Sequence, residues 1–261
     1  MIKRINVALI LIIFLTTTIY AQVGGGLMFP GPGVGVGGFT VSNSGSWNGT
    51  NAAMNRTFAA PTSNKKWTYF AWFKFNVVNN YQYFLFSSGT GSTFNLRLNN
   101  NATIQLAIAG TLVYKTTNTF TTGVWYPLTF QFDSDNATQA DRFIVYNCTT
   151  RLSTSTASVA SGQTTSFNAN GGVVYNGYDN GNDFAVYANW LEAETTFIDG
   201  AVQGPTSFVS SCNPKNQTGL TYGTNGFWLK YQNSGALGTD SSGNGNTWTN
   251  SNVTQSSTVP P

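Results

Sequence analysis

The sequence predicts an all-β protein, a sandwich or jelly roll built from two antiparallel sheets. From Phe39 onward, short stretches rich in aromatic and β-branched residues alternate with Asn, Gly, Ser and Thr turns. Several stretches alternate apolar with polar side chains, as Phe94–Leu98 does, which predicts strands with one buried and one hydrated face. No stretch of ten or more residues there repeats its apolar side chains with helical spacing. Together these patterns favour the sandwich architectures.

The N-terminus has the pattern of a secretory signal. Lys3 and Arg4 precede nine apolar residues, 7–15, and three threonines then lead to Ala21. A membrane-spanning helix needs about 20 apolar residues, so we predict a signal peptide over residues 1–21, with an uncleaved anchor as the alternative. The mature protein is expected to be secreted, extracellular or at the cell surface, with no membrane span after the signal is removed.

Residues 22–38 form a Gly/Pro-rich leader. Gly33, Gly35 and Gly38 match the GxGxxG spacing, but no strand precedes them and no helical pattern follows. The dinucleotide-binding interpretation therefore lacks its structural context. We predict an extended or flexible leader, followed by one jelly-roll domain over residues 39–261.

Ten stretches of this domain are predicted to be strands. They are residues 66–75, 81–87, 93–98, 103–109, 111–115, 124–132, 142–147, 173–178, 184–197 and 226–232. We predict that the last of them is a core strand beside 184–197. Phe227, Leu229 and Tyr231 would then share one face, and Trp228 and Lys230 the other.

The tryptophans divide by their sequence surroundings. Four of them lie within predicted strands and are expected in the core: Trp67, Trp72, Trp125 and Trp228. Trp47 and Trp248 lie beside Gly- and Asn-rich stretches, so we expect these two to be exposed.

Composition and charge exclude several classes of function. The chain has no histidine, which removes Ser-His-Asp and Cys-His catalysis and histidine-ligated zinc. Only 8% of residues are charged, and loss of Lys3 and Arg4 with the signal would leave ten basic and nine acidic residues. Such a balance argues against nucleic-acid binding. A polar, weakly charged surface with 15% aromatic residues suits sugars or protein surfaces better.

The two cysteines, Cys148 and Cys212, are the only available partners for each other. In an exported protein we expect a disulfide between them, with two buried thiols as the alternative. The bridge would close a loop of about 65 residues, worth about 4 kcal/mol in the chain-entropy model.

Two acidic groups are candidates for chemistry. Strand alternation would place Glu192 and Glu194 on one face, about 7 Å apart, the spacing of an inverting glycosidase. A solvated strand face or a salt-bridged rim is the alternative for this pair. Asp133 and Asp135 form a compact acidic turn that is a weak calcium candidate. The EF-hand spacing is not met, so an Asx-stabilised hairpin turn is favoured and no cofactor is expected.

The segment from Tyr175 to Tyr187 combines aromatic faces with amides and carboxylates, the groups from which sugar sites are built. The predicted ligand-binding residues are Tyr175, Tyr178, Asp179, Asn182, Asp183 and Tyr187. An ordinary turn at residues 179–183 is the alternative.

Several local motifs resemble those of the laminin-G-like family. They are KKWT at 65–68 with AWFK at 71–74, GVWY at 123–126, residues 133–147, FIDG at 197–200 with PTSF at 205–208, and YGTNGFWLK at 222–230 with DSSGNGNTWT at 240–249. The combination is similar to laminin-G-like virion surface proteins of tailed phages and to related microbial proteins. The resemblance implies the concanavalin A-like jelly roll, but a fold does not fix an activity.

The predicted function is therefore a secreted, non-catalytic, lectin-like adhesin that binds a neutral glycan or a cell or virion surface. One alternative is a structural subunit of a virion fibre, a decoration protein or an extracellular filament, which would assemble as a homo-oligomer. A second alternative is a glycan hydrolase of the jelly-roll glucanase type, based on Glu192 and Glu194.

Overall fold

The computed structural model describes residues 38–88, 93–180 and 185–261. Within these residues the chain forms strands and two short 3₁₀ turns, η1 (Gln139–Asp141) and η2 (Pro205–Ser207). The predicted signal peptide and nearly all of the predicted leader lie outside the described residues. In the described part of the chain, no helix is long and apolar enough to cross a membrane.

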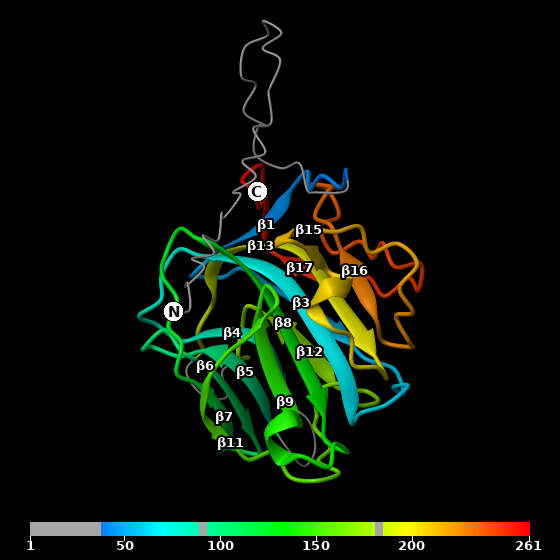
Figure 1. Cartoon of the computed structure of the whole chain (residues 1–261). Coiled ribbons are helices and arrows are strands. Elements are labelled where there is room, and N and C mark those ends of the chain that lie inside the picture. The colour runs from blue at the N-terminus through cyan, green and yellow to red at the C-terminus, as the bar shows by residue number, and fades with distance from the viewer. Residues whose placement is uncertain (1–37, 89–92, 181–184) are drawn as a thin grey trace, which may run out of the picture. The chain divides into compact units, whose positions relative to one another are not determined.

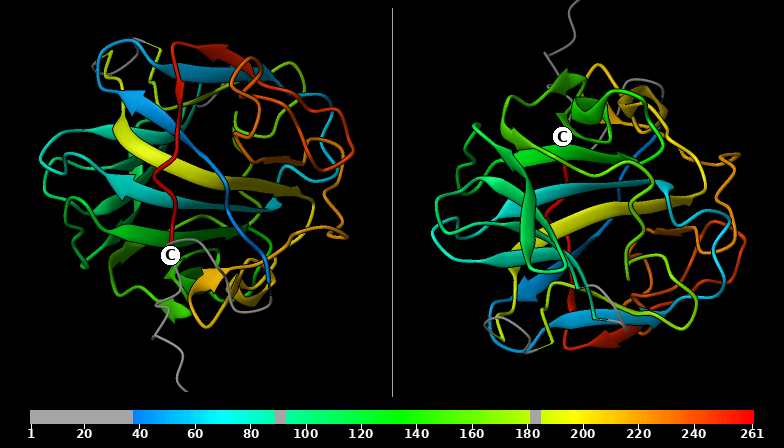
Figure 2. Two further views of the ribbon diagram at one scale, coloured as in Figure 1. Left: turned by 90° about the horizontal axis from the view of Figure 1, so that it is seen from above. Right: turned by 90° about the horizontal axis from the view of Figure 1, so that it is seen from below.

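The first large sheet is antiparallel and is built around β3 and β13 (Figure 1). Its strands lie in the order β10 (Thr150–Arg151), β9 (Phe143–Asn147), β8 (Trp125–Asp133), β3 (Lys66–Phe75), β13 (Asn189–Asp199), β1 (Ser44–Asn48) and β18 (Thr254–Ser256). A further strand, β16 (Phe227–Leu229), pairs with the C-terminal half of β13. The C-terminal β18 lies beside β1 at the edge of this sheet (Figure 2).

The second large sheet is also antiparallel. Its strands lie in the order β11 (Thr154–Ala157), β7 (Thr111–Thr116), β6 (Ile104–Ile108), β5 (Phe94–Leu98), β4 (Gln82–Ser88), β12 (Val173–Asn176), β2 (Ala53–Thr57) and β17 (Thr249–Ser251). A small hairpin of β14 (Val209–Ser210) and β15 (Asn213–Pro214) lies apart from both sheets in the pairing order.

The main core lies between the two sheets and is rich in aromatic rings. Phe84 of the second sheet stacks on Trp190 of the first, with ring centroids 5.3 Å apart. Trp67 stacks on Phe132 at 5.2 Å and meets Phe94 of the other sheet edge-on at 5.9 Å. The predicted sandwich of two antiparallel sheets is confirmed.

Each of the ten predicted stretches contains an observed strand, and most boundaries differ by one or two residues. The facing of the last stretch is also confirmed. Phe227, Leu229 and Tyr231 enter the core between the sheets, whereas Trp228 packs on the opposite side, with the Lys230 ammonium 4.0 Å from its ring centroid. Sequence patterns missed the five-residue strands β1 and β2 and several strands of four residues or fewer, such as the polar β17 and β18.

Trp67, Trp72 and Trp228 are buried as predicted, and Trp125 is half-buried. The expectation that Trp47 and Trp248 are exposed is wrong, because their exposed fractions are 0% and 3%.

Glycines that lie elsewhere in the sequence but contact these tryptophans in the fold explain the two burials. Trp47 packs edge-on against Tyr231 at 5.9 Å, and a Cβ on Gly177 would lie only 2.3 Å from the Trp47 ring. Trp248 meets Phe227 edge-on at 5.0 Å, and its backbone oxygen occupies the place of a Cβ on Gly238. Glycine here makes room for the packed ring or its backbone, so a Gly-rich context does not imply exposure.

A second, smaller core covers the outward face of the first sheet. Phe70 and Trp72 of β3 and Ile198 of β13 pack there against Phe208 and Tyr222 of the segment 200–225. A disulfide bond joins Cys148, in the turn after β9, to Cys212, in the turn between β14 and β15. The two Cα atoms are 5.3 Å apart, within the range that a disulfide requires. The bridge ties the covering hairpin to the sheet.

Candidate functional site

The outward face of the second sheet carries the aromatic segment singled out in the sequence. Tyr175 lies on β12, where the side chains on either side of it, Val174 and Asn176, point into the sandwich. Its own side chain therefore lies on the outward face. Across the sheet it is paired with Phe86 of β4 and with Asn55 of β2.

Tyr175, Tyr178 and Tyr187 form what we call the tyrosine cluster. Tyr178 and Tyr187 face each other across a β-bridge, and their rings stack with centroids 4.3 Å apart and planes 11° apart. Tyr175 meets Tyr178 edge-on at 5.9 Å. All three are half-buried, so parts of their rings remain accessible. Burial, followed by a hydrogen bond to Tyr187, raises the pKa of Tyr178, so its phenol is neutral and can donate at pH 7.

The structure brings the three predicted tyrosines together, but it gives Asp179 a different environment. Asp179 is fully buried, and its Oδ1 accepts a hydrogen bond of 3.1 Å from the backbone N–H of Val186. Its carboxylate thus joins the residue after Tyr178 to the residue before Tyr187. Asn182 and Asp183 lie outside the described residues.

A group of residues beside the cluster was missed by sequence analysis. The Arg97 guanidinium lies over the rings of Tyr81 and Tyr83, at 4.9 and 5.7 Å from their centroids. Its Nη1 donates to the Tyr83 hydroxyl at 3.0 Å, and its Nη2 lies 3.4 Å from Oε1 of Gln105. The sequence pattern that could have indicated this group is the apolar–polar alternation over 94–98, because it places Asn95 and Arg97 on the hydrated face. Only the pairing of β4 with β5 shows which aromatic residues they join.

Glu192 lies between the two sheets rather than at a surface. Its carboxylate accepts hydrogen bonds from Tyr69 Oη at 2.9 Å, Thr195 Oγ1 at 2.7 Å and, from the opposite sheet, Asn176 Nδ2 at 3.0 and 3.1 Å. Complete burial nevertheless raises its pKa to about 7, because these donors only partly offset the loss of hydration.

Glu194 lies on the opposite face of the same strand. A β-bulge interrupts the pairing of β13 with β3 between Ala193 and Thr196, and Glu194 has a φ of 54° there. Its Oε2 accepts a hydrogen bond of 2.7 Å from the Trp228 indole in the second core. Burial raises its pKa to about 7, although the Trp228 hydrogen bond and the Lys230 charge act the other way.

The expectation that Glu192 and Glu194 share one face is therefore wrong, and so is the alternative of a solvated face, because both carboxylates are buried. The bulge adds one residue to the strand, which breaks the two-residue alternation on which that expectation was based. Two buried carboxylates on opposite faces of a sheet cannot flank one glycosidic bond.

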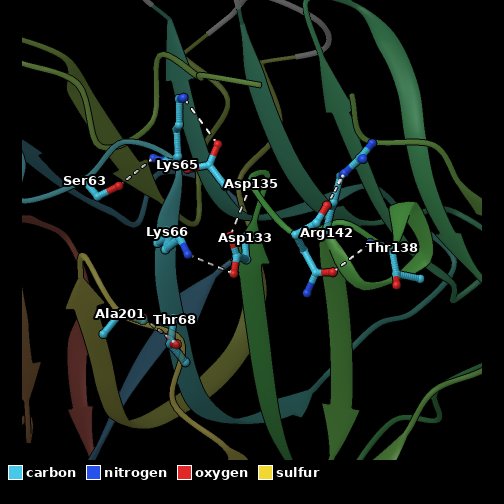
Figure 3. Close-up of polar contacts among 10 residues, drawn as sticks. Ser63, Lys65, Lys66, Thr68, Asp133, Asp135, Thr138, Arg142 and Ala201 are labelled. Atoms are coloured by element: carbon cyan, nitrogen blue, oxygen red, sulfur yellow. Dashed lines mark hydrogen bonds and ion pairs between the residues drawn. The ribbon is translucent and has the colours of Figure 1, made fainter. Parts of the chain in front are cut away.

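The weak calcium candidates lie at the end of β8 and are engaged with lysines (Figure 3). Asp133 pairs with Lys66 at 3.4 Å and Asp135 with Lys65 at 3.3 Å. Oδ1 of Asp133 also accepts the backbone N–H of Asp135 at 3.2 Å, which makes the turn an Asx turn. Among the described residues, no group of three or more acidic, Cys or His side chains could hold a metal ion.

Two cavities lie beside the loop 235–239. The larger, about 290 Å³, is lined by this loop and by Thr247, Trp248 and Asn250, and the smaller, about 140 Å³, includes Lys230 and Tyr231. Neither contains a member of the tyrosine cluster.

No family model matches the chain, and no curated protein matches it significantly. Among solved structures it is similar to a "putative carbohydrate binding protein" from Bacteroides ovatus, with a TM-score of 0.62 and 14% sequence identity. The match covers 83% of this chain but 60% of that one, so the chain spans less than two thirds of that protein's length. At this identity the likeness shows the fold alone.

Two further solved structures match with lower scores. A heptameric SAP-like pentraxin from Limulus polyphemus matches with a TM-score of 0.49 and 13% identity, over 70% of this chain and 88% of that one. A Trypanosoma rangeli sialidase in complex with sialic acid matches with a TM-score of 0.45 and 13% identity, over 64% of this chain and 28% of that one. Both scores lie below 0.5, so neither bears on this chain's function. The resemblance to laminin-G-like virion proteins stays a prediction from sequence.

Proposed function

We propose that the protein is a secreted, non-catalytic glycan-binding module that binds a neutral glycan at the tyrosine cluster. The observation that carries this proposal is the gathering of Tyr175, Tyr178 and Tyr187 on the outward face of the second sheet, with amide and hydroxyl side chains beside them.

The chemistry of these groups suits a sugar. The C–H faces of a sugar ring pack on accessible aromatic rings, while amides and neutral phenols exchange hydrogen bonds with its hydroxyls. The low charge of the chain favours a neutral glycan over an anionic one. The structural neighbour from Bacteroides ovatus is in keeping with this proposal.

We expect a single site to bind weakly. A half-buried cluster offers limited contact area, so the dissociation constant should lie in the micromolar to millimolar range, about 4–8 kcal/mol. Display of many copies on a cell or particle surface would raise the avidity and make the module an effective adhesin.

A glycan array probed with multimerised protein lacking residues 1–21 tests the proposal. A neutral glycan should bind, and Tyr178→Ala with Tyr187→Ala should reduce that binding at least tenfold without changing the melting temperature by more than a few degrees. Tyr146→Ala is the matched control, because Tyr146 is a half-buried tyrosine on β9 of the other sheet. Equal binding by all three proteins would exclude the cluster as the site.

An array without hits would reject the glycan proposal altogether. If the same protein then formed filaments or particles on its own, the structural-subunit alternative would replace the adhesin.

A further inference from the structure

We propose that the ligand is an extended glycan chain that lies across strands β12, β2 and β17, rather than a single terminal sugar held by the tyrosines. This inference rests on the proposed function and names the class of glycan. It follows from the register of three strands and from the unequal exposure on the two sides of Tyr175.

The register aligns one outward row of side chains. Tyr175 of β12 is directly opposite Asn55 of β2, and Asn55 is directly opposite Thr249 of β17. Directly opposed residues point to the same face of a sheet, so these three side chains lie in a line perpendicular to the strands. Strands lie about 4.8 Å apart, which places Thr249 about 10 Å from Tyr175.

The surface around this row is short, polar and uncharged. Thr57, Thr249 and Ser251 are exposed and Asn55 is half-buried. The charged residue of β2, Arg56, alternates to the other face, where it contacts Asn246 and lies 5.2 Å from the Phe58 ring centroid. Hydroxyl and amide groups without large side chains form a shallow strip along which sugar hydroxyls can exchange hydrogen bonds.

The opposite side of Tyr175 is closed. Its neighbour on β4, Phe86, is completely buried, and so is Tyr83 on the same strand. The buried side chains of β4 offer a sugar no contact beside Tyr175, whereas the accessible side chains of β2 and β17 do, so a ligand that stacks on the tyrosine cluster extends toward β2 and β17. Because β17 is the last strand of its sheet, the strip ends at an open edge, and a longer chain can continue past it.

Polarity distinguishes this ligand from a protein partner. Protein interfaces have buried apolar centres, whereas the exposed large apolar side chains of the described residues, Leu112, Val124 and Val202, are not part of this strip. An uncharged strip of hydroxyls leading away from an aromatic stack fits a linear neutral polysaccharide.

The test is a series of oligosaccharides of increasing length, derived from the glycan that binds on the array and measured by isothermal titration calorimetry. Affinity should rise at least tenfold between the disaccharide and the tetrasaccharide and then level off. The double variant Asn55→Ala, Thr249→Ala should lose most of that gain while it binds the disaccharide as the unmodified protein does. Ser155→Ala, on the edge strand at the other end of the same sheet, should leave the whole series unchanged.

A second measurement avoids dependence on the variants. In NMR spectra of the unmodified protein, the side-chain amide of Asn55 should shift with the tetrasaccharide and not with the monosaccharide. Binding that is equally tight at every length, with no shift at Asn55, would overturn the extended chain and leave the tyrosine site standing. Absence of binding at every length would overturn both proposals.

Discussion

The two outward faces of the sandwich differ in whether another part of the chain covers them. On the first sheet, the outward residues of β3 and β13 are large and apolar, as Phe70, Trp72 and Ile198 are, and the segment 200–225 covers them. On the second sheet, Asn55, Thr57, Thr249 and Ser251 on the outward face are short and polar, and they are half-buried or exposed beside the tyrosine cluster. A strand's outward face becomes a second core or a ligand surface according to whether another part of the chain buries it.

The largest expected effect is the loss of folding when the C-terminal strands are removed. Deletion of residues 221–261 removes β16, β17 and β18, which leaves Phe197 without its Phe227 neighbour and takes Trp248 from the core. We expect the truncated protein not to fold, as judged by near-UV circular dichroism. A soluble truncated protein with an unchanged melting temperature would contradict this.

One substitution on each face compares what the two faces contribute to the free energy of unfolding. Phe208 is fully buried and stacks on Phe70 at 4.7 Å, so Phe208→Ala should reduce the free energy of unfolding by about 3–5 kcal/mol. Tyr178→Ala, on the open face, should cost less than half of that. Urea denaturation measures both, and equal losses would show that the tyrosine cluster is as structural as the second core.

The disulfide also holds the segment 200–225 against the first sheet. Cys148→Ser with Cys212→Ser should lower the free energy of unfolding by about 2–4 kcal/mol, because the unfolded chain gains conformational freedom. Glycan binding to the folded variant should not change, since the bridge lies on the other face. Non-reducing peptide mapping of exported protein checks that the bridge forms, and free thiols in that material would contradict it.

The two buried glutamates should give a pH dependence of stability. Burial raises the pKa of Glu192 and of Glu194 to about 7, whereas the unfolded chain releases these protons near pH 4.5. Between these values the folded state binds more protons than the unfolded state, so stability should fall as pH rises from about 4.5 to 7. The fall should be about 3 kcal/mol for each carboxylate.

Glu192→Gln and Glu194→Gln should each flatten part of this pH profile. Melting temperatures measured between pH 4 and 8 provide the test. Unchanged profiles in both variants would show that these carboxylates titrate normally.

The fold was largely predictable from the sequence because alternation and turn residues are local signals. Most strands were found within a residue or two, although β13 begins five residues after its predicted start, and the facing of Phe227, Trp228 and Leu229 followed from alternation alone. For the candidate site, the sequence located the three tyrosines, because they lie in one short segment around an Asn- and Asp-rich turn.

Tertiary structure decided what alternation could not. One extra residue in β13 moved Glu194 to the opposite face from Glu192, and glycines in distant turns made room for Trp47 and Trp248. Cross-strand pairing alone placed Asn55 and Thr249 in line with Tyr175, although 120 residues separate Asn55 from Tyr175 along the chain. Local sequence determines which way a side chain points from a regular strand without a bulge. Long-range pairing determines what it meets there, because hydrogen-bond register joins strands irrespective of their separation in sequence.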